Sequence, residues 1–329
     1  MARLLVPSRH LSFASSGGRE MKRCVLLVGL ITAGWLSLTL AGYQGAPSGP
    51  TAAALQATKI EKVKDNLYII TGSSDLAAFS GGNTAVFITD AGVVLVDTKL
   101  PGWGPTVLER VKTVTSKPVT TIINTHSHSD HSGSNEFFAA NVDSVVHENA
   151  KANMARMEEF KGDKAKVLPK RTFKDKLSIG KGKDQVDLYY FGRGHTNGDT
   201  FIVFPALRTM HAGDMFAQKQ LPLVDTMNGG SAVGYPETLA RAAAGIRDVD
   251  TVIPGHRQIA TWNEFQEYAA FTKDFVDFAR SSVNAKKTVQ QAAADYKVPA
   301  KYSGYVVTID PQLVTAAGLF QIAFDELKK

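Results

Sequence analysis

Residues 124–134 concentrate side chains that can bind a metal ion. The segment reads Asn-Thr-His-Ser-His-Ser-Asp-His-Ser-Gly-Ser, so three imidazoles and one carboxylate fall within six positions, namely His126, His128, Asp130 and His131. Imidazole and carboxylate groups are ligands that suit zinc, iron or manganese. The small residues between them let the backbone turn tightly, so neighbours in sequence can point at different metal positions. The pattern favours a metal site over a chance cluster.

Two further histidines stand in short turns marked by glycine, each after a run typical of a strand. His195 follows residues 186–191 within Gly-Arg-Gly-His-Thr-Asn-Gly-Asp, and His256 follows residues 251–253 within Val-Ile-Pro-Gly-His. A glycine just before the histidine permits an abrupt turn that can present the ring to a shared centre. Both histidines are therefore candidate ligands.

The other three histidines are given no ligand role. His10 lies in the leader, a packed or exposed strand residue is the favoured interpretation of His147, and His211 is expected near the site without binding metal. Asp214 follows Gly213 in the same strand-then-turn pattern. A strand-end aspartate is most often a turn former or helix cap, but this one stands among ligand candidates at the expected place in their order.

The order of these residues resembles that of the metallo-β-lactamase superfamily of hydrolases. The resemblance runs from about Ile60 to about Tyr268 and includes an upstream hairpin, residues 83–98, that carries Asp97. Its motifs, in chain order, are His126-Ser-His128-Ser-Asp130-His131, Gly194-His195, Gly213-Asp214 and Pro254-Gly255-His256.

The resemblance implies a site for two metal ions held by seven side chains. The first metal would be bound by His126, His128 and His195. The second would be bound by Asp130, His131 and His256, and Asp214 would bridge the two metals. Asp97 would hydrogen-bond to a ligand and orient it without binding metal.

Such a site has a defined chemistry. A metal pair lowers the pKa of bound water toward ~7, polarises the substrate oxygen and stabilises the leaving group. Asp130 is the candidate catalytic residue, which would take a proton from the attacking water or pass it to the leaving group. Zinc is the default expectation for both divalent ions, and iron or manganese would accept the same ligands.

The resemblance narrows the function to a class. In many antibiotic-degrading metallo-β-lactamases a cysteine stands where this chain has Asp214, so the ligand set resembles the glyoxalase, lactonase and other esterase-like branches. We expect hydrolysis of an ester, thioester, lactone or amide bond of a small molecule. A β-lactamase is an alternative. An iron-dependent oxidoreductase is another, although His128 stands where di-iron reductases of this superfamily carry a carboxylate. A metal-binding accessory protein without turnover is the non-catalytic alternative.

The elements that must position these residues are an alternation of strands and helices. Residues 119–124 are expected to form the strand that delivers the histidine cluster, and helices are expected at 105–115, 134–140, 147–160, 236–246 and 262–282. Apolar residues at helical spacing in the last of these predict a core-facing stripe. Strand-rich halves with ligands at strand ends predict an α/β fold. We expect an αβ/βα four-layer sandwich of two mixed β-sheets flanked by helices, with the metals in a cleft at one edge.

The sequence patterns that suggest substrate contacts are less specific than the pattern of the metal ligands. The connection 73–82 would cover the metals in the family, and a plain hairpin loop is the alternative. Asn228 could donate to a developing oxyanion, although a glycine-rich turn is favoured there. A solvated side chain is likewise favoured over a substrate contact at Lys219. Residues 192–194 lack the third glycine of a dinucleotide loop, so no such cofactor is expected.

The composition of the chain indicates its general class and the partners it excludes. The chain has 329 residues, 44% of them hydrophobic, as in ordinary globular proteins. Its net charge of +6 is concentrated in residues 1–46, whose five basic groups and one acid leave only +2 for the remainder. A nucleic-acid partner needs a focused basic surface, so none is expected. The single cysteine, Cys24, precedes the apolar leader and predicts a mature chain without disulfides or thiolate ligands.

The N-terminal region resembles a targeting segment. Lys22-Arg23 precede an uncharged apolar stretch that reaches Ala41, so residues 1–41 are predicted to be a signal peptide, with Met21 a possible true start. Export to the periplasm or beyond follows, without stable membrane insertion after processing; an uncleaved membrane anchor is the alternative. The predicted order then runs through a linker (42–57), a hydrolase domain (58–283) and a C-terminal helical extension (284–329). The extension belongs either to the same domain or to a dimer contact, and the oligomeric state is left open.

Overall fold

The computed structural model describes residues 50–329 except 74, 140–141 and 308–314. The predicted signal peptide therefore lies outside the described residues. Within the described ranges, every helix is too short or too polar to span a bilayer. Pro47–Lys329 groups as one compact unit.

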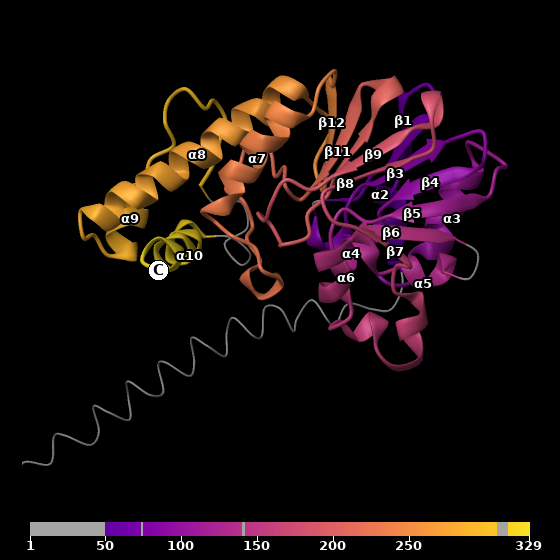
Figure 1. The fold of residues 1–329 in the computed structure, drawn as a ribbon, viewed down its shortest axis with the longest axis horizontal. Coiled ribbons are helices and arrows are strands. Elements are labelled where there is room, and N and C mark those ends of the chain that lie inside the picture. The colour runs from indigo at the N-terminus through magenta and orange to yellow at the C-terminus, as the bar shows by residue number, and fades with distance from the viewer. Residues whose placement is uncertain (1–49, 74, 140–141, 308–314) are drawn as a thin grey trace, which may run out of the picture. The chain divides into compact units, whose positions relative to one another are not determined.

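The first of two central sheets has strands whose spatial order follows their order in the chain (Figure 1). The strands are β1 (Ile60–Lys64), β2 (Leu67–Ile70), β3 (Thr84–Ile88), β4 (Val93–Val96), β5 (Val119–Ile123), β6 (Asp143–His147) and β7 (Arg171–Phe173). The strands from β1 to β4 pair antiparallel, and those from β4 to β7 pair parallel. The run Val-Val-Leu-Val of β4 is wholly buried, as expected where a strand is covered on both faces.

The second sheet has the order β13-β12-β11-β10-β9-β8. Its strands are β8 (Lys176–Ile179), β9 (Val186–Tyr189), β10 (Phe201–Phe204), β11 (Thr209–Gly213), β12 (Thr251–Pro254) and β13 (Ala260–Thr261). All pairs are antiparallel except β11 with β12, which are parallel. A parallel pair needs a crossover, and the helix α7 (Gly234–Gly245) lies in the connection between them.

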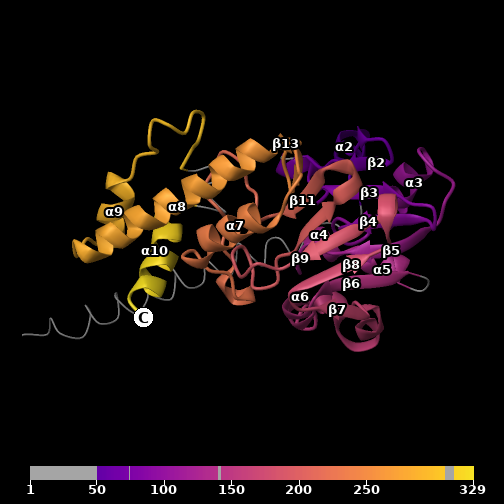
Figure 2. The same cartoon turned by 45° about the horizontal axis from the view of Figure 1, so that its top comes forward.

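The two sheets pack face to face, and helices cover their outer faces. Apolar side chains from both sheets form one buried cluster, in which the ring centroids of Phe87 and Phe204 lie 5.0 Å apart. Outside the first sheet, α3 (Gly104–Lys112) contributes Val107 and Val111 to a separate cluster. Figure 2 shows α7 and α8 (Trp262–Asn284) beside the second sheet. The predicted four-layer αβ/βα sandwich is confirmed.

The shorter helices differ in places from the sequence prediction. They are α2 (Ala52–Ala57), α4 (Ser129–Ser132), α5 (Asn135–Phe138), α6 (Glu148–Met154), α9 (Val289–Asp295) and α10 (Ala316–Leu327). The helix α2 occupies part of the segment predicted as a linker, because its alanine-rich sequence favours helix and Thr51 caps its first turn.

The helix predicted at 147–160 was too long. It ends at Met154, and two 3₁₀ turns follow at Glu158–Phe160 and Gly162–Val167. Met154 and Phe160 are both buried in one small cluster. Six residues along an α-helix correspond to a rotation of about 240°, so an unbroken helix would point these side chains in different directions. The break lets both reach the same core.

The C-terminal helices share the core of the second sheet. The predicted stripe of α8 is buried at Phe265, Tyr268, Phe271 and Phe275. Phe320 of α10 is fully buried, with its ring centroid 4.6 Å from that of Phe275. The predicted extension thus packs against α8 within the same compact unit.

This packing predicts a large effect of Phe320→Ala. Truncation of a buried phenylalanine removes transfer free energy and leaves a cavity, so we expect the free energy of unfolding to fall by about 3–5 kcal/mol, measured by denaturant titration. Gln321→Ala, at an exposed position of the same helix, should change it by less than about 0.5 kcal/mol. Equal effects of the two changes would contradict the packing of α10.

Candidate metal centre

The seven side chains singled out by the sequence come together in the structure. Each follows the carboxyl end of a strand or begins the short helix after it: β5 and α4 supply four of them, and the turns after β9, β11 and β12 supply the rest. They form two adjoining groups, His126, His128, His195 and Asp214, and Asp130, His131 and His256.

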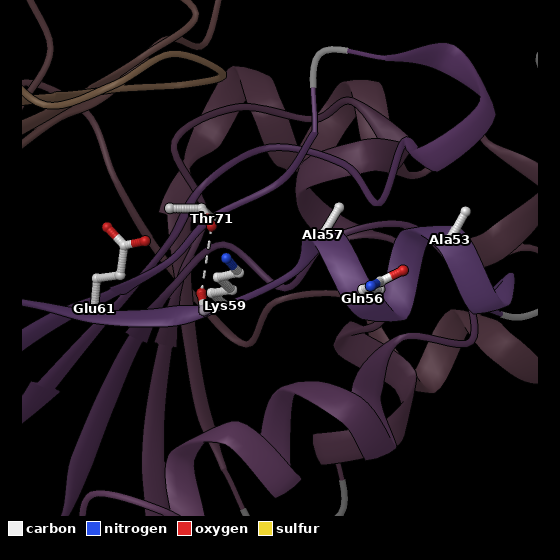
Figure 3. Close-up of a pocket in the computed structure, with 6 residues that line it drawn as sticks. All are labelled: Ala53, Gln56, Ala57, Lys59, Glu61 and Thr71. Carbon is white, nitrogen blue, oxygen red and sulfur yellow. Dashed lines mark hydrogen bonds between the residues drawn. The ribbon is translucent and has the colours of Figure 1, made fainter.

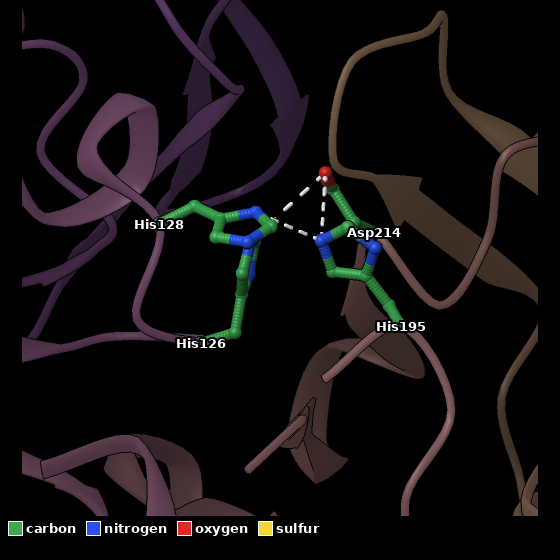
Figure 4. Close-up of side chains that lie close together, drawn as sticks. All are labelled: His126, His128, His195 and Asp214. Carbon is green, nitrogen blue, oxygen red and sulfur yellow. Dashed lines mark hydrogen bonds and ion pairs between the residues drawn. The ribbon is translucent and has the colours of Figure 1, made fainter. Parts of the chain in front are cut away.

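In the first group, the potential ligand atoms lie within 4.8 Å of one another. His128 Nδ1 and His195 Nε2 are 3.0 Å apart. Asp214 Oδ2 lies 3.9 Å from His126 Nε2 and 3.6 Å from His195 Nε2. Figure 4 shows these side chains pointing toward one another from separate segments of the chain.

The second group is equally close and adjoins the same carboxylate. His131 Nε2 lies 3.1 Å from His256 Nε2, and Asp130 Oδ2 lies 3.2 Å from His256 Nε2. Asp214 Oδ1 is 3.3 Å from His131 Nε2, and its Oδ2 is 3.3 Å from His256 Nε2. Asp214 therefore stands between both groups.

The residues fit a bound cation. His126 Nε2 is buried without a hydrogen-bond partner, although it faces the cluster. A buried polar atom left unsatisfied costs about 1–3 kcal/mol. Ligand nitrogens at about 2.0 Å from a tetrahedral metal lie roughly 3.3 Å apart, and the separations above are close to that value. The chain thus carries a metal-binding cluster of histidines and aspartates.

Outer hydrogen bonds fix which nitrogen faces the cluster in the rings of His131, His195 and His128. Buried Asp97 accepts from Thr125 N at 2.8 Å, and its Oδ2 lies 2.7 Å from His131 Nδ1. The carbonyl oxygen of Leu223 lies 2.9 Å from His195 Nδ1. Such partners set the tautomer and orientation of metal-binding imidazoles.

Asp225 holds His128 in the same way. Its Oδ2 lies 2.7 Å from His128 Nε2, which leaves Nδ1 facing His195. Asp225 was not predicted from the sequence as part of the site, although Asn228 of the same segment was a candidate substrate contact. The Asn228 amide nitrogen instead donates to Asp225 Oδ2 at 2.6 Å, within a glycine-ended turn.

Two glycines pack directly against residues of the cluster. A Cβ atom on Gly82 would collide with the ring of His131, and one on Gly255 would collide with Asp214 Oδ1. Asn83 braces the turn that carries His256, because its amide donates to the carbonyl oxygens of Pro254 and Arg257, each at 2.8 Å. Asn83 is a further residue that sequence reasoning did not identify as part of the site.

The histidines of the cluster differ in their pKa values. Burial lowers the pKa of His126 well below its usual value and that of His195 to about 4. Burial also opposes charging of His131 and His256, but the neighbouring carboxylates outweigh it and raise the pKa of His131 well above its usual value and that of His256 to about 9. A carboxylate partner likewise outweighs burial at His128 of the first group and raises its pKa. Metal binding requires neutral imidazole, so protons compete with metal at His128, His131 and His256.

A buried lysine lies beside the second group. Lys99 is fully buried and donates to the carbonyl oxygen of Gly82 at 2.8 Å. Burial lowers its pKa to about 7, against the opposing influence of Asp130 and Asp97. No sequence signal identified this lysine, because a lysine just after a strand normally reaches solvent.

The other residues considered from the sequence lie as follows. His147 caps α6 and lies 2.8 Å from the carbonyl oxygen of Lys174, and His211 is buried beside the carbonyl oxygen of Asn83. Lys219 donates to the carbonyl oxygen of Ser303 at 3.1 Å. In the connection 73–82, the ring of Phe79 stacks near that of His256, with centroids 5.6 Å apart.

A separate open hollow of about 420 Å³ lies beside α2 (Figure 3). Its lining includes exposed Lys59 and Glu61, and Thr71 donates to the carbonyl oxygen of Lys59 at 3.4 Å. The lining contains no imidazole, so this hollow lacks the chemistry of the cluster described above.

Comparisons with known proteins agree with this geometry. Residues 78–256 match the model of the metallo-beta-lactamase superfamily. The chain is 32% identical over 164 residues to metallo-beta-lactamase type 2 of Elizabethkingia meningoseptica, which covers 47% of this chain and 61% of that protein. It is 28% identical over 234 residues to 2,4-dinitroanisole O-demethylase subunit alpha of Nocardioides sp. (strain JS1661), which covers 68% of this chain and 62% of that protein. The alignments thus span about three fifths of these relatives' length.

Solved structures show the same fold. A metallo-beta-lactamase from Pontibacter korlensis aligns with a TM-score of 0.57 and 21% identity over 66% of this chain and 99% of its own. The DIM-1 metallo-beta-lactamase aligns with a TM-score of 0.55 and 19% identity over 66% of this chain and 97% of its own. Because the family model matches more than half of its residues, the chain belongs to the metallo-beta-lactamase superfamily, a family of metal-dependent hydrolases.

Proposed function

We propose that this protein is an exported dinuclear metal hydrolase that cleaves an ester, thioester, lactone or amide bond of a small molecule. The observation that carries the proposal is the position of Asp214, whose two oxygens approach both histidine groups within 4 Å. In this proposal His126, His128 and His195 hold the first metal, Asp130, His131 and His256 hold the second, and Asp214 bridges the pair. Zinc is the ion we expect.

The bound metals would supply Lewis acidity and a nucleophile derived from water at neutral pH. The protein's own groups support that chemistry on the accessible side of the cluster. The side chains of His128 and His256 are 23% and 30% exposed, whereas that of His126 is 1% exposed. Substrate would therefore approach past His128 and His256.

Asp130 is placed to handle a proton. Its side chain is 16% exposed, and His131 and His256 lower its pKa below the usual value although burial opposes this. The carboxylate is therefore ionised at neutral pH and can accept a proton from water or hold it for the leaving group.

A β-lactam is a second candidate substrate. The relative from Elizabethkingia meningoseptica is named as a metallo-beta-lactamase, which favours this alternative. The carboxylate of Asp214 at the bridging position favours the ester, thioester or lactone class, as argued from the sequence. A substrate panel decides between them.

Metal analysis joined to that panel tests the proposal. We expect the purified full-length protein to bind about two zinc ions per chain and to hydrolyse an ester, thioester, lactone or amide, with activity lost on chelation and restored by zinc. Elemental analysis gives the stoichiometry. Inactivity of the metal-loaded protein against esters, thioesters, lactones, amides and β-lactams would overturn the proposal.

A pair of histidine variants provides the control. His126→Ala should reduce the bound metal to about one ion per chain or less and remove activity, because it deletes a ligand of the first metal. His147→Asn should leave metal content unchanged, since asparagine can also cap α6. Equal metal loss in both variants would indicate a general effect on folding.

Gly255→Ala tests the close contact behind Asp214. The added methyl group would push into Asp214 Oδ1, so we expect metal affinity to fall at least tenfold, measured by competition with a chromogenic chelator, while far-ultraviolet circular dichroism stays near wild type. Gly318→Ala, in α10, is the matched control and should retain affinity. Wild-type affinity in Gly255→Ala would show that the bridging position tolerates displacement.

Export is supported by Lys22-Arg23 and the apolar stretch that follows them. If residues 1–41 are a signal peptide, the protein recovered from a Gram-negative host's periplasm should have the intact mass of a chain that begins at Gly42. Recovery of an uncleaved chain in the membrane fraction would support the anchor alternative instead.

A further inference from the structure

The C-terminal helix α10 contacts the loop that adjoins the metal cluster. The carboxylate of Glu326 accepts three hydrogen bonds from consecutive residues: Ser231 Oγ at 2.6 Å, Ala232 N at 3.1 Å and Val233 N at 3.1 Å. The latter two amides immediately precede α7, where backbone N–H groups have no partner within the helix and attract negative charge. The partners are 93 to 95 positions apart in the chain.

The same loop is tied to the turn that carries His195. Asp225 N donates to the carbonyl oxygen of His195 at 2.8 Å, and Ser231 N donates to that of Gly194 at 2.9 Å. The loop is thus fixed at both ends beside one histidine of the cluster, and through Asp225 Oδ2 it contacts a second, His128.

Apolar packing holds only the end of this loop, where Ala232 is buried in the core shared with α7 and α8. Met227 is 78% exposed and Leu223 is 39% exposed. Segments with few buried contacts open at low free-energy cost unless hydrogen bonds hold them. From the α6 side, Arg156 donates to Asn228 Oδ1 at 2.9 Å, and from the α10 side Glu326 makes the three bonds described above.

The helix that supplies Glu326 is itself well anchored. Phe320 and Phe324 of α10 are buried in the core shared with α8. This helix lies outside residues 78–256, which match the superfamily model.

We propose that Glu326 is a positioning residue for the metal site: it fixes the loop 225–233 and, through Asp225, the orientation of His128. The effect on metal affinity rests on the proposed function, whereas the effect on the loop does not. The C-terminal helices would thereby set the strength of the first metal site without touching a metal.

The test compares Glu326→Gln with Asp325→Asn, an equal change of charge at an exposed neighbouring position. Hydrogen exchange of the amides in 225–233 is measured on metal-free full-length protein. We expect exchange there to rise at least tenfold in Glu326→Gln and to stay at the wild-type level in Asp325→Asn. Unchanged exchange in Glu326→Gln would overturn the proposal.

Zinc affinity, measured by chelator competition, tests the link to His128. Loss of an outer hydrogen-bond partner typically lowers metal affinity about 10–100-fold, so we expect Asp225→Asn to fall in that range and Glu326→Gln to approach its lower end. Because Glu326 acts through Asp225, Glu326→Gln should cause no further loss in the Asp225→Asn background. An equal loss in both backgrounds would overturn the proposed route.

Glu326→Asp keeps the test decisive if Glu326→Gln fails to fold. The shorter carboxylate retains the charge but reaches the three donors less well, so it should give a smaller rise in loop exchange and a smaller loss of affinity. Wild-type values for both would overturn the proposal. A wild-type protein that binds no zinc would overturn the proposed function, while loop exchange would still report on the contact with Glu326.

Discussion

Imidazole rings and carboxylates crowd into one partly buried space, and the carboxylate of Asp214 stands among them with a side chain only 13% exposed. Without a cation, this arrangement leaves a buried nitrogen of His126 unpaired and brings ring nitrogens of His128 and His195 to 3.0 Å. Such groups stay in place only if the surrounding structure fixes them. Gly82 and Gly255 do so by direct backbone contact, and outer hydrogen bonds do so for the rings. The fold is thus organised around holding these donors together.

Strand ends provide the rigidity that this requires. Both sheets contribute, since β5 belongs to the first and β9, β11 and β12 belong to the second. The apolar cluster between the sheets joins them, so the two ligand-bearing edges keep their spacing. A loss of packing between Phe87 and Phe204 would therefore affect the metal site, although neither ring is part of it.

The candidate ligands could be predicted from the sequence, whereas most of the residues that position their side chains could not. His195 and His256 were predictable because a glycine follows an apolar run and a histidine follows the glycine, a local pattern. Asp225, Lys99 and Glu326 were not predictable, because a carboxylate in a loop, a lysine after a strand and a glutamate on a helix are common at solvent-exposed positions. The partners of Asp225 and Glu326 lie 97 and 95 positions away and that of Lys99 lies 17 positions away, and only the tertiary fold brings them together. The helix predicted at 147–160 failed for a similar reason, because burial of Phe160 outweighed local helix preference.

The two halves of the site are supported in different ways, and this difference has a functional meaning. His131 and His256 are fixed by Asp97 and by turns braced through Asn83, all within the matched family core. His128 depends on a loop that is exposed at Met227 and held by Arg156 and Glu326. In the proposed two-metal site, a change in α10 would therefore alter the first metal position while the second keeps its geometry. Such a division would allow the metal-binding residues of the family core to stay unchanged while a helix outside that core alters the metal affinity of the proposed first site.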